Sequence, residues 1–251
     1  MYELYALAYG FSRSRHGALV RGAGEERVDN AWLFFAALSD TRRVLIDTGC
    51  GDYHPKEPEH ALGFVEPAGL LSEVRVEPAQ ITDVIATHMH FDHIGDVLRY
   101  DRATVYVQRE ALEHARSLVG PERPHVQAVR LVDVEAMEEI DRQGRLMVLE
   151  GDYEVAPGLS VRLSGGHAAG LQHVVVETQQ GRFVLASDDA YLYENVEREV
   201  PPGFCRDFAR TARSLKEMKA LVEDPVRVIP GHDYAITKRF ERVSERVFRL
   251  A

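Results

Sequence analysis

The chain has 251 residues, of which 45% are hydrophobic and 28% charged, and this balance excludes both a disordered and a collagen-like protein. The formal net charge of −10 argues against a broad nucleic-acid-binding surface and favours a small-molecule partner. The longest apolar runs, such as Ala31 to Leu38, are shorter than the roughly 20 residues of a transmembrane helix, and the first residues lack a secretory signal, so we expect a cytoplasmic protein that does not bind membranes.

Short runs rich in β-branched and aromatic residues alternate with helical patterns along the chain. In chain order, strands are predicted at Trp32 to Leu38, Arg43 to Ile46, Asp83 to Thr87, Ala103 to Val107, Leu159 to Leu163, His173 to Thr178, Arg182 to Ala186 and Val226 to Ile229. Helices are predicted at Ile94 to Leu98, Glu110 to Leu118 and Phe208 to Val222, the last ended by Pro225. Since no linker, repeat or low-complexity tract divides the sequence, we expect residues 1–251 to form one layered α/β or α+β domain.

Histidine and aspartate residues follow four of the predicted strands. They are His88, His90, Asp92 and His93 after Asp83 to Thr87, His167 after Leu159 to Leu163, Asp188 after Arg182 to Ala186, and His232 after Val226 to Ile229. Loops at one edge of a sheet bring residues from distant parts of a sequence together, so we expect a single site. Residues two apart in an extended segment face the same way, which lets His88 and His90 bind one ion together.

Imidazole and carboxylate groups are the ligands that zinc accepts in proteins. Seven such residues are too many for one tetrahedral ion, but they suit two zinc ions that share one carboxylate. Each residue alone has an ordinary alternative: Asp92 as a helix N-cap, His167 or His232 as a hydrogen-bonded loop histidine, and Asp188 in a solvated turn. These alternatives do not explain why all of them follow strands.

The order of these motifs resembles the metallo-β-lactamase superfamily. The similarity rests on His88-Met89-His90-Phe91-Asp92-His93 followed by Gly95, on Gly166-His167, on Asp188 and on Gly231-His232, and it extends over nearly the whole chain. It implies an αββα sandwich of two mixed β-sheets with outer helices and two divalent metal ions at one edge. It also implies the ligands: His88, His90 and His167 for one ion, Asp92, His93 and His232 for the other, and Asp188 between them.

A finer similarity points to the N-acyl-homoserine lactonase branch. It rests on Asp188-Asp189-Ala190-Tyr191, continued by Glu194-Asn195 and Glu199-Val200-Pro201. In that branch a Tyr three residues beyond the shared Asp reaches the substrate, which implies this role for Tyr191; the alternative is a packing aromatic. The implied reaction is the opening of a lactone ring by hydroxide held between the ions, with Tyr191 stabilising the oxyanion and Asp92 relaying a proton. The native metal, the particular lactone and a homodimer stay open.

Two stretches depart from the family pattern. After His167 the sequence reads Ala168-Ala169-Gly170-Leu171-Gln172 in place of Thr and a Gly-His pair, which leaves the substrate contacts of that loop open. The segment with Arg13, Arg15, His16 and Arg21 has no counterpart. We expect it to be a solvated loop; the alternative is a lid that brings positive charge over the site and binds a substrate carboxylate.

Other interpretations of the same ligands are less compatible with the sequence. Thioesterases of the superfamily usually add a C-terminal helical domain, whereas 19 residues follow His232, and nucleases usually add a large insertion or a basic arm. A redox branch would carry Glu in place of His90 and a flavin domain. An inactive module would tolerate missing ligands, although all seven and Tyr191 are present. Hydrolysis of another small ester, thioester or cyclic amide is the main alternative.

Overall fold

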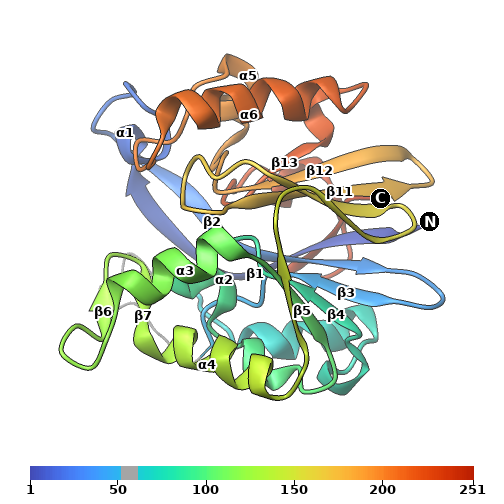
Figure 1. Cartoon of the computed structure of the whole chain (residues 1–251). Coiled ribbons are helices and arrows are strands. Elements are labelled where there is room, and N and C mark those ends of the chain that lie inside the picture. The colour runs from blue at the N-terminus through green and yellow to red at the C-terminus, as the bar shows by residue number, and fades with distance from the viewer. Residues whose placement is uncertain (52–61) are drawn as a thin grey trace.

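The centre of the computed structural model, which describes residues 1–51 and 62–251, is a pair of β-sheets packed face to face (Figure 1). The strands of the larger sheet are, in spatial order, β14 (Glu241–Arg242), β15 (Val247–Arg249), β1 (Glu3–Arg15), β2 (Arg27–Leu38), β3 (Arg43–Ile46), β4 (Asp83–Ile85), β5 (Thr104–Gln108) and β8 (Leu146–Leu149). Those of the smaller sheet are β13 (Val228–Pro230), β12 (Gly181–Ser187), β11 (Gln172–Thr178), β10 (Leu159–Leu163) and β9 (Tyr153–Ala156). Both sheets are mixed, because β3, β4, β5 and β8 run parallel and so do β12 and β13.

Helices cover the outer faces of the two sheets (Figure 1). The larger sheet is covered by α3 (Arg109–Leu118) and α4 (Leu131–Arg142), and the smaller sheet by α5 (Tyr193–Arg198) and α6 (Phe208–Ala220). The short elements are α1 (His16–Leu19), η2 (Pro67–Val74), η3 (Pro78–Gln80), α2 (Phe91–Ile94), η4 (Val97–Arg99), β6 (His125–Val126), β7 (Val129–Arg130), η5 (Pro225–Arg227) and α7 (Ile236–Arg239). The predicted αββα sandwich is confirmed.

Alternation along the strands builds the layers of the core. In β1, Leu4 and Ala6 join the apolar cluster between the sheets, whereas Leu7 and Tyr9 join the cluster beneath α3 and α4. This follows because neighbouring strand residues point to opposite faces, and both faces of β1 are covered. No helix within residues 1–51 and 62–251 has the length and apolar character needed to span a membrane.

Two local predictions are wrong. The helix expected from Ile94 to Leu98 is instead the single turn α2, which ends at Ile94, followed by η4. Gly95 and Asp96 separate them: Gly95 is still helical, Asp96 leaves the helical region, and a Cβ on Gly95 would lie 2.6 Å from the carbonyl oxygen of Cys50, so the position has no room for a side chain. The solvated loop expected around Arg13 and Arg15 is the end of β1, paired with β2.

Candidate metal centre

The histidine and aspartate side chains identified in the sequence gather at one edge of the sandwich. The segment after β4 carries His88, His90, Asp92 and His93, and the loops after β10, β12 and β13 carry His167, Asp188 and His232. Parallel pairing of β12 with β13 brings the ends of these two strands to the same edge. The structure thus places all seven side chains in two neighbouring groups.

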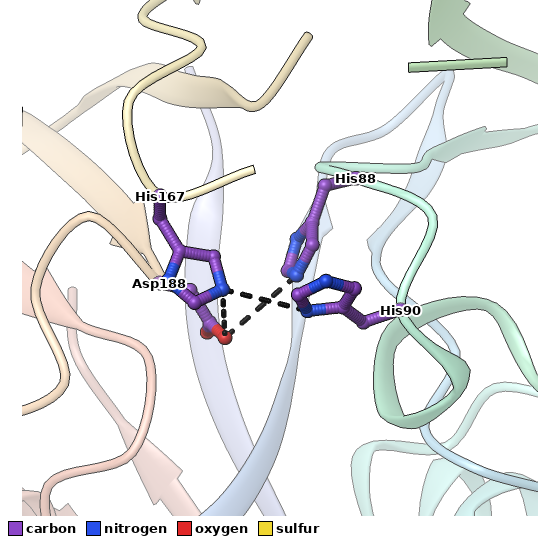
Figure 2. A group of neighbouring side chains, drawn as sticks. All are labelled: His88, His90, His167 and Asp188. Atoms are coloured by element: carbon purple, nitrogen blue, oxygen red, sulfur yellow. Dashed lines mark hydrogen bonds and ion pairs between the residues drawn. The ribbon is translucent and has the colours of Figure 1, made fainter. Parts of the chain in front are cut away.

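The first group consists of His88, His90, His167 and Asp188, whose candidate ligand atoms all lie within 4.8 Å of one another (Figure 2). Asp188 Oδ2 lies 3.4 Å from His167 Nε2 and 3.7 Å from His88 Nε2. His167 Nε2 lies 3.4 Å from His90 Nδ1. Ligands held about 2.1 Å from a tetrahedral ion are roughly 3.4 Å apart, so these separations suit one ion the size of zinc.

The second group consists of Asp92, His93 and His232, whose candidate ligand atoms also lie within 4.8 Å of one another. Asp92 Oδ2 is 3.6 Å from His93 Nε2 and 3.8 Å from His232 Nε2. The other oxygen of Asp188 faces this group, with Oδ1 lying 3.1 Å from His232 Nε2 and 3.3 Å from His93 Nε2. One carboxylate therefore spans both groups, with a different oxygen toward each.

Burial and charge act differently on the imidazoles of the two groups. Burial lowers the pKa of His88 well below its usual range and, with the nearby ring of His167, lowers the pKa of His90 to about 3. Both rings are therefore neutral at pH 7, the form that binds a metal. Burial also disfavours charge on His93, but carboxylates, foremost Asp188, raise its pKa well above the usual value. The second group thus favours positive charge.

Three buried polar atoms of the site have no hydrogen bond within the described part of the chain: His88 Nε2, His93 Nε2 and Asp188 Oδ1. Leaving a buried polar atom without a hydrogen bond costs about 1–3 kcal/mol, so three such atoms in one place indicate that a ligand binds there. A cation in each group would satisfy all of them, and imidazole with carboxylate is a donor set that zinc accepts. The residues present fit two divalent ions.

Acceptors outside the two groups fix the orientation of three histidine rings. The Nδ1 atom of His93 donates to Asp47 Oδ2 over 2.7 Å, that of His167 to the carbonyl of Phe204 over 2.9 Å, and that of His232 to the carbonyl of Ala31 over 3.0 Å. A neutral ring with Nδ1 committed as donor carries its lone pair on Nε2, the atom that faces the site.

The sequence analysis missed Asp47, the buried carboxylate that holds His93. Its Oδ1 also accepts the backbone N–H of Thr87 over 2.8 Å, and its Oδ2 accepts the Thr87 hydroxyl over 2.9 Å. The carboxylate therefore ties the end of β3 to the segment that leads into His88. The sequence does carry a feature that could have identified Asp47, because this residue directly follows a predicted strand, as the other candidates do.

A cavity of about 830 Å³ opens beside the two groups. Its lining includes His90, Asp92, His167, Asp188 and Tyr191, together with the apolar side chains of Met89, Phe91, Ala111, Ala115, Leu118 and Val129. Ala111, Ala115 and Leu118 are spaced four and three residues apart, so α3 turns one apolar face toward the cavity. The space can hold a ligand with a polar end and an apolar end.

Tyr191 stands between the two groups of candidate ligands. Its ring centroid lies 5.5 Å from that of His167 and 5.1 Å from that of His232. Burial and the carboxylate of Asp188 raise the pKa of Tyr191 well above its usual value, so the phenol keeps its proton and can donate a hydrogen bond. The structure places this residue where it can reach a ligand at either group.

The arginines of the N-terminal hairpin do not contribute to the cavity. Arg13 pairs with Asp29 over 3.0 Å and Arg15 with Glu25 over 3.4 Å. Arg21 lies 4.0 Å above the ring of Phe208. Since none of these arginines is in the cavity lining that the structure describes, the alternative of a lid that brings their charge over the site is not supported.

Comparison with known protein families shows which family the chain belongs to. Residues 25–232 match the family model described as the metallo-beta-lactamase superfamily. The chain belongs to this superfamily. Among curated metallo-β-lactamase relatives, an N-acyl homoserine lactonase of Bacillus thuringiensis is 34% identical over 169 residues, which are 65% of this chain and 60% of the relative. The N-acyl homoserine lactonase AttM of Rhizobium johnstonii is 29% identical over 212 residues, 79% of this chain and 69% of the relative.

Solved structures share the metallo-β-lactamase fold of this chain. A quorum-quenching N-acyl homoserine lactone lactonase gives a TM-score of 0.79 at 24% identity and covers 98% of both chains. AidC, described as a dizinc quorum-quenching lactonase in complex with a product, gives a TM-score of 0.73 at 16% identity and covers 99% of this chain and 94% of its own. At these identities the likeness establishes the fold, and the match to the Bacillus relatives spans about 60% of their length.

Proposed function

We propose that the protein is a metal-dependent hydrolase that opens the ring of an N-acyl-homoserine lactone or a related small lactone. The observation that carries this proposal is one carboxylate, Asp188, facing three histidines with Oδ2 and the second group with Oδ1, at the wall of a large cavity. Curated relatives named as N-acyl homoserine lactonases support the same reaction.

The proposed ligands follow the two geometric groups. His88, His90 and His167 would hold one ion, Asp92, His93 and His232 the other, and Asp188 both. We propose zinc as the metal, since imidazole and carboxylate donors at these separations suit its tetrahedral preference. A solved neighbour described as a dizinc lactonase supports this choice.

Two divalent ions, when bound, would supply hydroxide at neutral pH and polarise the carbonyl of the substrate. Side chains of the protein would stabilise the developing charge and transfer the proton. The protonated phenol of Tyr191 would donate a hydrogen bond to the oxygen on which negative charge develops. Asp92, in the first turn of α2 with its side chain 16% exposed, would pass a proton to the leaving alkoxide. The Tyr9 hydroxyl donates to the backbone carbonyl of Asp92 over 2.9 Å and steadies this turn.

The cavity supports a lactone that carries an acyl chain. A polar ring and amide would lie at the histidines, and the apolar face of α3, formed by Ala111, Ala115 and Leu118, would bury the chain. Each buried methylene is worth about 0.8 kcal/mol, so a longer acyl chain gains affinity until the cavity is full. The hairpin arginines are absent from the described lining, and the arginine that does line the cavity, Arg206, pairs with Glu110 over 3.4 Å, which favours neutral over carboxylated lactones.

A hydrolysis screen tests this proposal. Metal-supplemented, purified protein should open acylated lactones faster than an unsubstituted or a carboxylated lactone, and faster than it hydrolyses a glutathione thioester, a phosphodiester or a β-lactam. A pH-indicator assay measures all of them, and elemental analysis should find about two metal ions per chain. Activity confined to the thioester or the amide would overturn the lactonase proposal and leave the dimetal hydrolase; less than one metal per chain would overturn both.

Replacing Tyr191 by phenylalanine should lower kcat and leave the metal content and the fold unchanged, because only the hydroxyl is removed. Loss of one oxyanion donor commonly costs ~10²-fold, but a metal acting on the same oxygen would reduce the loss to about tenfold. Steady-state kinetics with several lactones, beside elemental analysis of the variant, measures this. An unchanged kcat would assign Tyr191 a packing role.

Two further expectations from the sequence stay predictions. Residues 1–251 are proposed to form one domain, and the protein is proposed to reside in the cytoplasm. Cys50 and Cys205 are not joined in a disulfide, which is compatible with a reducing compartment. The oligomeric state stays open and is measured by light scattering of the metal-loaded protein.

A further inference from the structure

His16 connects two segments that are far apart in the sequence. It begins α1 at the end of β1, and its Nδ1 lies 2.7 Å from Glu26 Oε1, just before β2. Its Nε2 lies 2.7 Å from Glu194 Oε2, in the first turn of α5. The His16 side chain is 18% exposed, and Arg198 also pairs with Glu194. We call His16, Glu26 and Glu194 the His16 clamp.

The clamp requires a positively charged imidazole. Carboxylates only accept hydrogen bonds and a neutral imidazole has a single N–H, so both contacts are hydrogen bonds only when both ring nitrogens carry a proton. The hydrogen bond with Glu26, opposed by burial and reinforced by Glu194, raises the pKa of His16. The neighbouring Arg15 pairs with Glu25 over 3.4 Å. The clamp is therefore intact while His16 is protonated.

Behind the clamp, the turn of α1 is attached to residues 192–203. Three hydrogen bonds of 3.0 Å connect them: Asn195 Nδ2 donates to the carbonyl of Leu19, and the backbone N–H groups of Gly203 and Arg21 donate to the carbonyls of Ala18 and Pro201. The two backbones approach closely, because a Cβ on Gly203 would lie 2.0 Å from the carbonyl oxygen of Gly17. Movement of α1 would therefore move this segment.

The attached segment continues into the wall of the cavity. Tyr191 precedes it and packs against the small apolar cluster that contains Leu19 and Val20. Phe204 and Arg206 follow it, and together with Tyr191 they line the cavity. The carbonyl of Phe204 also accepts the 2.9 Å hydrogen bond from His167 Nδ1. The position of α1 therefore bears both on Tyr191 and on a histidine of the first group.

We propose that His16 is a positioning residue: as a cation shared by Glu26 and Glu194, it holds the wall from Tyr191 to Arg206 against the metal centre. Its kinetic consequence rests on the proposed lactonase function, whereas its effect on the order of residues 192–206 does not. The wall would be fixed at lower pH and released as His16 loses its proton. Hydrolysis would then fall through loss of geometry, with both metals still bound.

The sign of the pH dependence follows from the direction of the pKa shift. A histidine whose pKa is raised by folding stabilises the folded contacts fully below its unfolded pKa of about 6.5, and that stabilisation is lost as pH rises through the folded value. The groups facing His16 are Glu26 from the hairpin and Glu194 from α5, and the pKa of each is lowered by its partners. Both carboxylates stay ionised over this range, so His16 alone titrates.

Two substitutions of His16 separate the charge from the side chain. His16→Gln keeps N–H donors but removes the positive charge that the two carboxylates share. It should lower kcat about tenfold, since small misplacements of catalytic groups have effects of this size or larger. His16→Arg keeps a permanent cation with several donors and should restore kcat. The ratio of wild-type to His16→Arg kcat should fall as pH rises from about 6 to about 9, because only the wild type loses its charge.

Hydrogen exchange of residues 192–206, measured on metal-loaded protein and corrected for intrinsic rates, gives a readout that needs no substrate. His16→Gln and Glu26→Gln should exchange faster there, whereas the matched control Glu25→Gln, one residue away and paired with exposed Arg15, should not. Exchange at the wild-type rate in both clamp variants, or a kcat ratio that does not change with pH, would overturn the proposal.

If no lactone is opened, the exchange experiment and NMR titration of the His16 ring still decide it. If His16→Gln does not fold, Glu26→Gln replaces it.

Discussion

Asp188→Asn is expected to lose at least one of the two metal ions and nearly all hydrolytic activity. Asp188 Oδ2 faces His88 and His167, while Oδ1 faces the second group, so this carboxylate offers a different ligand oxygen to each group. An amide keeps one acceptor oxygen, loses the negative charge and presents an N–H to one group. Since losing a partner outside the ligand set already costs about 10–100-fold, we expect a fall in kcat of at least ~10²-fold.

Elemental analysis and kcat measured on the same preparation check this prediction. Asp189→Asn provides a matched control, because Asp189 is the adjacent buried carboxylate and its Oδ1 accepts the backbone N–H of His167 over 3.1 Å, a bond that an amide oxygen can keep. The control should retain both ions. Near wild-type turnover in Asp188→Asn would show that the shared ligand is misassigned, and equal metal loss in the control would indicate general damage to the loop.

Local sequence signals were sufficient to predict the strands that lead into the metal centre. The strand Leu159 to Leu163 is observed with the predicted bounds, because its apolar alternation and flanking turns are both local features. The ends of the helix predicted from Phe208 are less certain from sequence, and α6 ends at Ala220, two residues before the expected end. Side chains that follow strands could be grouped in advance because strands that run in the same direction end at the same edge of a sheet.

Features that depend on distant contacts were not predictable in this way. The close packing of Gly95 against the backbone of Cys50, which is 45 residues away, has no local signature. The long first strand was missed because both of its faces are buried, which removes the alternation that identifies a half-exposed strand. Asp47 was overlooked although it follows a predicted strand, because its partner His93 is identified only once β3 and β4 are paired in parallel.

Asp47→Asn is expected to weaken metal binding without removing a ligand. Asp47 Oδ2 accepts the Nδ1–H of His93 over 2.7 Å, so the neutral ring that would bind an ion carries its lone pair on Nε2, toward the second group. If the asparagine oxygen keeps the N–H of Thr87, its amino group faces Nδ1, and two donors then oppose each other. The ring must change tautomer or rotate, so we expect affinity for the ion at this group to fall about 10–100-fold.

Competition with a chelator measures the affinity of each ion, and kcat at saturating metal shows whether activity returns when the site is refilled. Asp83→Asn is the matched control, because Asp83 is a buried carboxylate on the neighbouring strand β4 that accepts from Arg42 over 2.8 Å and from the Tyr106 hydroxyl over 3.1 Å. It should lose a similar amount of thermal stability, since it also loses a charged hydrogen bond in the core. Metal affinity should change only in Asp47→Asn, because only its carboxylate orients a ligand; equal affinities in the two variants would mean that Asp47 supports the fold alone.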